Sequence, residues 1–307
     1  MRFFHKFGSL NYDYIGLVNG ILLSKKKKQY TNTFEYLKKY TSALKKEASV
    51  QPAESSNGRI WQCWLQGKNC MPQIVKVCTD SVKKYHPDKT ILLDNKTIYE
   101  YITIPDYILE KYKKRIISDA HFSDICRLML LAKYGGCWVD ATIYLTGEIP
   151  DEIINAEFFT FRSYESNIFK NISSEKEFQI YNNYFNKAIS PESSFFISAQ
   201  KGNKIINNIL NMILEYWKYE DRVINYLFFD QCFAWTLFSN PELKKQFLDM
   251  PEYYIPNIML LQNTLFEPYD EQLFKNICKQ SNIHKLTHKN LHRNPYKNSF
   301  YKHIINL

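Results

Sequence analysis

The run from Ser123 to Leu145, SDICRLMLLAKYGGCWVDATIYL, constrains the fold more than any other segment of the chain. Apolar residues recur at helical spacing through its first half, which predicts a helix with one face in a core. Gly135 and Gly136 end that helix, because glycine adopts left-handed backbone conformations without a steric penalty. The apolar residues that follow predict a buried strand, and Asp140 stands where that strand should emerge. A helix that feeds a buried strand in this way is typical of an α/β sheet.

Charged residues interrupt the run at positions where burial would be costly. Asp124 and Arg127 are one helical turn apart, so we expect them on the same side of the helix, with Ser123 as the N-cap. A carboxylate such as Asp140, placed after a core strand, needs a cation or hydrogen-bond donors. Open α/β sheets bind ligands at the carboxyl ends of their strands. The run therefore predicts a polar ligand site at that edge.

The flanking sequence predicts further elements of such a sheet. A strand at 59–65, a helix from Pro72 to Tyr85 and a strand at 90–93 form a β-α-β start with a right-handed crossover. Two more apolar strands are expected at 158–162 and 194–199. Successive helices are expected at 202–219 and 222–238.

The motif resembles that of the DXD-type glycosyltransferases of the GT-A fold, and most closely that of the capsular polysaccharide synthesis group. The pattern S-D-x-x-R, an apolar helix and Y-G-G-x-W/Y-x-D-x-D/T are matched by Ser123, Asp124, Arg127, Tyr134, Gly135, Gly136, Trp138, Asp140 and Thr142. Weaker similarities lie at 60–67, 229–231 and 284–289, so the resemblance extends over most of the chain. It implies a GT-A nucleotide-diphospho-sugar transferase fold with a mostly parallel, Rossmann-like sheet.

The resemblance implies a metal-assisted transfer, with retention of configuration at the sugar. Asp140 would be the catalytic metal ligand, because Mn²⁺ or Mg²⁺ takes oxygen ligands and can bridge phosphate oxygens. Thr142 stands where the family has a second acid, and its hydroxyl is a weaker ligand. His284 would be a further ligand. The alternative is that Asp140 only caps a turn.

Other residues would bind the nucleotide-diphosphate sugar. Asp124 and Arg127 match the pair that contacts sugar hydroxyls, or they form only an intrahelical ion pair. Trp64 matches the aromatic residue that stacks on the base, or it is a core tryptophan, a role for which Trp61 has the stronger claim. Gln66, just past the strand end, could approach the ribose or a phosphate.

Two later segments complete the candidate site. Asp230 and Gln231 resemble a catalytic pair that contacts the transferred sugar; their alternative role is to cap a helix or tether a loop. Lys285 and Lys289 could pair with the donor diphosphate as point charges. The alternative is that this last cluster is a solvated basic tail.

The charge distribution divides the chain. The net charge is +9, yet residues 1–50 hold ten Lys and Arg against three acids, which leaves only +2 for the rest. We expect a basic helical extension at 1–57, with an amphipathic helix at 31–49, and a GT-A domain at 58–307. The nearly neutral domain disfavours nucleic acid as a partner, whereas the basic extension is suited to peripheral contact with an anionic membrane. The extension could instead pack on the domain through apolar residues that include Leu37.

The expected function is a glycosyltransferase that moves a sugar from a nucleotide-diphosphate donor to a glycan or lipid-linked acceptor, in capsule or surface-polysaccharide synthesis. Seven scattered cysteines without a zinc spacing favour the reducing cytoplasm, and the basic extension is suited to the inner face of the membrane. Two alternatives stay open: a toxin-like transferase that acts on a protein, and a non-catalytic membrane- or nucleic-acid-binding protein.

Overall fold

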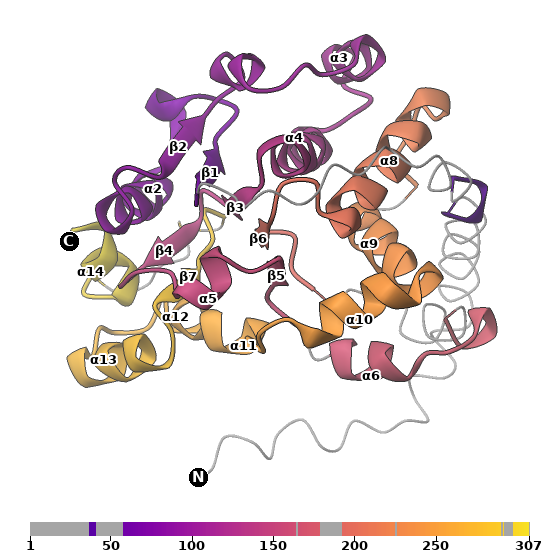
Figure 1. Ribbon diagram of the computed structural model, residues 1–307. Helices are drawn as coiled ribbons and strands as arrows, with labels where there is room; N and C mark the ends of the chain where they lie inside the picture. The colour runs from indigo at the N-terminus through magenta and orange to yellow at the C-terminus, as the bar shows by residue number, and fades with distance from the viewer. Residues whose placement is uncertain are drawn as a thin grey trace, which may run out of the picture.

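The structure is a computed structural model in which residues 37–40, 58–163, 165–178, 192–224, 226–289, 291 and 297–306 are described (Figure 1). Its centre is a five-stranded sheet with the order β2-β1-β3-β6-β5. The strands are β1 (Ile60–Cys63), β2 (Thr90–Leu93), β3 (Gly136–Val139), β5 (Phe158–Thr160) and β6 (Phe196–Ala199). β1 pairs in parallel with β2 and β3, whereas β6 runs antiparallel to β3 and β5. Only β6 is reversed, so the expectation of an α/β fold with a mostly parallel sheet is confirmed.

Helices cover the sheet and extend beyond its edges. They are α2 (Gln73–Tyr85), α3 (Asp106–Lys113), α4 (Asp119–Tyr134), α5 (Asp151–Ile154), α6 (Glu165–Asn171), α8 (Lys204–Tyr219), α9 (Phe228–Ser239), α10 (Pro241–Asp249), α11 (Ile255–Ile258), α12 (Leu260–Asn263), α13 (Glu271–Gln280) and α14 (Phe300–Ile305). α4 packs against α8, and α8 against α9, while α14 packs against α2. Figure 1 shows α8, α9 and α10 on the side of the molecule opposite to α2, α13 and α14.

β3 illustrates how the sequence divides the core. Successive side chains of a strand point to opposite faces of its sheet. Trp138 accordingly lies in the cluster formed with α4, α8 and α9, whereas its neighbours Cys137 and Val139 lie in a second cluster with Val82 of α2. All three β3 residues are at most 1% exposed. Burial on both faces explains why this strand is a continuous apolar run rather than an alternating one.

Gly135 and Gly136 join α4 to β3 where only glycine fits. Their φ angles are 65° and 98°, in the region that disfavours side chains. A Cβ at Gly135 would lie 2.5 Å from the backbone nitrogen of Lys201, and one at Gly136 would lie 2.4 Å from the carbonyl oxygen of Arg59. The turn between α4 and β3 can thus pack directly against the backbone at Arg59 and Lys201.

The β-α-β start forms as expected, but one helix start differs. α4 begins at Asp119, and its N-cap is Ser118, whose hydroxyl accepts a hydrogen bond from the His121 amide at 3.3 Å. The expectation that Ser123 is the N-cap is therefore wrong, because Ser123 lies inside the helix. α9 likewise begins at Phe228, later than expected.

A second, two-stranded sheet lies beside the first. β4 (Ile143–Leu145) pairs antiparallel with β7 (Ile283–Lys285), so that Ile143 lies opposite Lys285. The next residue, Leu286, donates its backbone N–H to the Thr142 carbonyl at 2.9 Å. This pairing brings a segment from far along the chain to the end of the motif.

Within the extension at 1–57, the structure describes only 37–40, which form one helical turn. Leu37 and Tyr40 are buried in the cluster around α8, and the Tyr40 hydroxyl donates to Glu220 at 2.6 Å. This turn therefore packs on the domain. The lysine run at 25–28 and most of the 31–49 helix lie outside the described residues, so the domain boundary and the membrane contact stay predictions. In the part of the chain that is described, no helix is long and apolar enough to span a membrane.

Candidate functional site

A cleft of about 730 Å³ opens at the carboxyl ends of β1 and β3. α4, the start of α9 and the residues that follow β7 form its walls. Most of the expected site residues line it: Trp64, Gln66, Asp124, Arg127, Asp140, Thr142, Asp230, Lys285 and Lys289. Another hollow of about 710 Å³, beside α5 and α10, contains none of them. The cleft is the candidate site.

The guanidinium of Arg127 is the centre of the cleft. It donates to Asp124 at 2.9 Å, one turn earlier on α4, and to Asp140 at 3.3 Å, beyond β3. Its carbon lies 4.9 Å from the ring centre of Trp138 and 5.6 Å from that of Phe229. The side chain is only 6% exposed. The intrahelical ion pair considered from the sequence therefore exists, but it belongs to a buried network rather than to a solvated surface.

Burial raises the pKa of Asp124 above its ordinary value, and the nearby Arg127 cation opposes that rise. Loss of water around Asp124 raises the free energy of its carboxylate. The guanidinium of Arg127 offsets part of that cost through the ion pair. Arg127 thus keeps the pKa of Asp124 lower than burial alone would make it.

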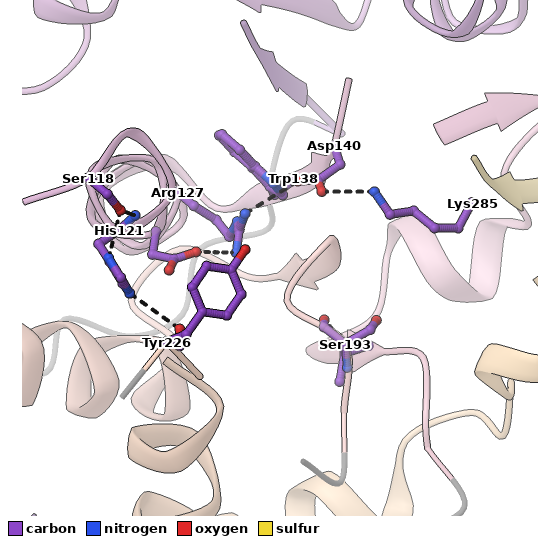
Figure 2. Close-up of polar contacts among 10 residues, drawn as sticks. Ser118, His121, Arg127, Trp138, Asp140, Ser193, Tyr226 and Lys285 are labelled. Carbon is purple, nitrogen blue, oxygen red and sulfur yellow. Dashed lines mark hydrogen bonds and ion pairs between the residues drawn. The ribbon is translucent and has the colours of Figure 1, made fainter. Parts of the chain in front are cut away.

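Asp140 accepts hydrogen bonds through both of its oxygens. Oδ1 accepts from Arg127 and from the indole N–H of Trp138, the latter at 2.9 Å. Oδ2 lies 3.3 Å from the ammonium of Lys285. Figure 2 shows Arg127 and Lys285 approaching Asp140 from opposite sides. Asp140 is thus the anion that holds two cations in place, which is more than capping a turn requires.

Lys285 comes from β7 and contacts both ends of the D-A-T triplet at 140–142. Besides Asp140, its ammonium is hydrogen-bonded to the Thr142 hydroxyl, and it lies 5.2 Å from the ring centre of Phe195. Its side chain is 20% exposed. Lys289, four residues later, is exposed at the rim of the cleft. The segment is therefore packed against the cleft at Lys285 and reaches solvent at Lys289.

Trp64 and Gln66 form the wall that follows β1. The ring of Trp64 is half-buried and meets His288 edge-on, with 5.3 Å between ring centres. Its buried indole N–H has no hydrogen-bond partner among the described residues. Trp61, in contrast, is fully buried and donates to the Gly135 carbonyl at 2.9 Å, as expected of a core residue. Gln66 is exposed and donates to Asp119 at 3.1 Å.

The structure separates the pair at the start of α9. Asp230 lines the cleft, whereas its neighbour Gln231 does not, although both are buried. Adjacent helical residues point about 100° apart, and the rotation of α9 turns Phe229 and Asp230 toward the cleft while Gln231 stays out of its lining. The geometry thus favours Asp230 over Gln231 as the residue near a bound ligand.

His284 is also separated from the cleft, because it precedes Lys285 on β7 and its side chain points to the other face. Its ring is fully buried and hydrogen-bonded to the Thr146 hydroxyl at 3.0 Å. It does not line the cleft. The expectation that His284 ligates a metal beside Asp140 therefore does not agree with this geometry.

Burial lowers the pKa of His284 from 6.5 to about 4, since the interior disfavours the charged ring. In the unfolded chain the His284 ring therefore takes up a proton as the pH falls below 6.5, whereas in the native protein it does so only near pH 4. Stability should fall across this window, by up to about 3 kcal/mol. We expect His284→Gln, which cannot titrate, to lose less stability than the wild type between about pH 7 and pH 4.5. Urea unfolding at both pH values measures this, and equal losses would contradict it.

The residues at the D-A-T triplet do not fit a resident divalent ion. Mg²⁺ and Mn²⁺ need several oxygen ligands. Both oxygens of Asp140 already accept hydrogen bonds from cationic or N–H donors, and the Thr142 hydroxyl is bonded to Lys285. Over the described ranges, no three His, Cys, Asp or Glu side chains gather in a way that could hold an ion. The metal stays a prediction that only the resemblance supports.

Three contacts in the cleft were not expected from the sequence. Trp138 donates to Asp140; its position two residues earlier, on the same side of the strand, was an available signal. Phe229 packs on Arg127 and His288 on Trp64. Each of these two contacts joins segments far apart in the chain, so no local pattern could reveal it.

Comparison with known protein families agrees with the resemblance to the capsular polysaccharide synthesis group that the motif at 123–142 carries. No curated protein matches the sequence. Among solved structures, the chain is similar to the PaToxG glycosyltransferase, with 15% identity and a TM-score of 0.39 over 72% of this chain and 85% of that one. The family model described as capsular polysaccharide synthesis protein matches residues 18–304. This match covers nearly the whole chain, including the motif and all the cleft residues, and the protein therefore belongs to the capsular polysaccharide synthesis family.

Proposed function

We propose that the protein is a glycosyltransferase that moves a sugar from a nucleotide-diphosphate donor to a glycan or lipid-linked acceptor during synthesis of a capsular or other surface polysaccharide. The observation that carries the proposal is the content of the cleft. Cations, carboxylates and an indole converge there from four separate segments of the chain. Membership of the capsule-synthesis family supports the biological setting.

The cleft matches the chemical needs of such a donor. A diphosphate needs cations, and Arg127, Lys285 and Lys289 supply them. Sugar hydroxyls need acceptors, and the carboxylates of Asp124 and Asp230 line the same space. A nucleobase needs a flat apolar surface and hydrogen-bond partners, and Trp64 has a half-buried ring with an unused N–H among the described residues. Retention of configuration, the cytoplasmic location and the membrane contact are parts of the same proposal.

The test is donor hydrolysis by the full-length protein. We expect release of the nucleoside diphosphate from at least one member of a panel of uridine, guanosine, adenosine and thymidine diphosphate hexoses, followed by mass spectrometry with and without Mn²⁺. Asp140→Asn serves as the inactive control, because it changes the anion that positions both cations. If no donor is cleaved faster than by this variant under any condition, the chain is a binding protein rather than a transferase. If a protein acceptor is glycosylated in preference to a glycan, the toxin-like alternative is correct.

A further inference from the structure

Lys285 lies where a divalent ion would be expected. In a DXD enzyme the ion is held by the acids of the triplet; here the triplet is Asp140, Ala141 and Thr142. The ammonium of Lys285 lies 3.3 Å from Asp140 Oδ2 and is also hydrogen-bonded to the Thr142 hydroxyl. A single cationic group of the protein therefore contacts both triplet side chains that could ligate an ion.

The fold fixes this ammonium in place. Lys285 is the last residue of β7 and pairs with Ile143 of β4, immediately after the triplet. The backbone bond from Leu286 to Thr142 continues this pairing on the other side. With its ammonium 5.2 Å from the ring centre of Phe195 and its side chain 20% exposed, Lys285 is a positioned group rather than a surface lysine.

The local charges balance without an ion. Asp124 and Asp140 carry two negative charges, and Arg127 and Lys285 carry two positive charges within the same hydrogen-bonded network. A divalent ion at Asp140 would have to displace Lys285 or lie beside it, and like charges at that distance repel strongly. The two cations that are already present can instead act on a bound diphosphate.

From the contacts of Lys285 we propose that it replaces the divalent ion, so that the protein binds a diphosphate and releases it as a leaving group without a metal. The proposal rests on the proposed glycosyltransferase function. In the transfer, the bond between the anomeric carbon and the β-phosphate oxygen breaks, and both electrons stay on that oxygen. The acceptor oxygen bonds to the anomeric carbon, and its proton is released to solvent. The ammonium of Lys285 stabilises the new negative charge as a donor that is already positioned.

Diphosphate binding tests the proposal apart from turnover. Inorganic pyrophosphate, which has no base or sugar, is titrated into the full-length protein in EDTA by calorimetry. We expect binding without metal, and a loss of affinity of at least about tenfold in Lys285→Met. Lys285→Arg keeps the charge and should bind within about threefold of the wild type, which separates charge from folding. Lys279→Met, on the exposed face of α13 and outside the cleft, is the matched control and should bind like the wild type.

Metal binding is measured directly by the electron paramagnetic resonance signal of free Mn²⁺. We expect the wild type to leave this signal unchanged. The double variant Thr142→Asp/Lys285→Ala has two acids in the triplet and lacks the ammonium, so we expect it to bind Mn²⁺ and to decrease the signal. Mn²⁺ binding by the wild type that is lost in Asp140→Asn would overturn the proposal, as would pyrophosphate binding that requires Mn²⁺. Donor turnover that Mn²⁺ supports and EDTA abolishes would overturn it while confirming the transferase. If no donor is turned over at all, the proposed function fails, and the pyrophosphate titration still decides the role of Lys285.

Discussion

Replacing Asp140 by asparagine is expected to lower donor turnover by a factor of about 10² to 10³, the usual effect of removing one preorganised charged group. The carboxylate holds Arg127 and Trp138 through one oxygen and Lys285 through the other. An amide has one acceptor oxygen, so its NH₂ group must face a donor on one side. One of the two cations then loses its hydrogen bond, and both lose the attraction of the negative charge at this position.

Steady-state kinetics and the thermal midpoint, measured together, separate the chemical effect from a folding defect. The matched control is Asp249→Asn, the same substitution at an exposed ion pair with Lys245, away from the cleft. That variant should keep wild-type turnover, because exposed pairs contribute little. Turnover of Asp140→Asn within about threefold of the wild type would remove Asp140 from the reaction.

The largest loss of stability is expected for Arg127→Met. This variant leaves two carboxylates, Asp124 and Asp140, without the guanidinium between them. Breaking a buried ion pair by removing one partner costs about 3–5 kcal/mol, because the other charge stays buried. Arg127→Lys keeps the charge but loses the fork that reaches both carboxylates, so we expect a smaller loss of stability and at least about a tenfold loss of turnover.

The pH dependence of the stability identifies why Arg127→Met loses stability. Without Arg127, Asp124 loses the largest of the effects that oppose burial, so its pKa rises further above its ordinary value. Protonation of Asp124 then removes the cost of an unpaired buried carboxylate from the native state of the variant. The difference in unfolding free energy between wild type and Arg127→Met should therefore decrease as the pH falls toward about 4. Adding Asp124→Asn to the variant should recover part of the loss at neutral pH. Urea unfolding measures each of these free energies. Arg115→Met, which breaks an exposed ion pair with Asp119, is the control. A loss of stability in this control as large as that of Arg127→Met would refute the explanation.

The parts of the site that the sequence predicted are those encoded by contiguous residues. Asp124, Arg127 and Asp140 lie within one run, and helix periodicity followed by a glycine pair and a strand is enough to place them at one sheet edge. The β-α-β start was predictable for the same reason, since each element has its own local pattern. The N-cap of α4 was not, because the segment 118–124 contains Ser-Asp twice, and both pairs satisfy the local rule.

The remaining differences depend on contacts between distant segments. His284 and Lys285 are adjacent, and only the register of β7 on β4 decides which one faces the cleft. A shift of one residue would exchange them. From sequence alone, both were assigned to the site, one as a ligand and one as a diphosphate contact. Asp230 and Gln231 are likewise adjacent, and the rotation of α9 about its axis decides which of them lines the cleft.

The pairing of Lys285 with Asp140 also sets the order in which the cleft can form during synthesis. The two residues are 145 positions apart. At about 5–20 residues per second, roughly 7–30 seconds separate their addition to the chain. Throughout that interval Arg127 and Trp138 already exist and can hold one oxygen of Asp140, but the partner of the other oxygen has not yet been made. A nascent chain stopped before β7 would therefore contain the whole motif and lack the cation that completes its site.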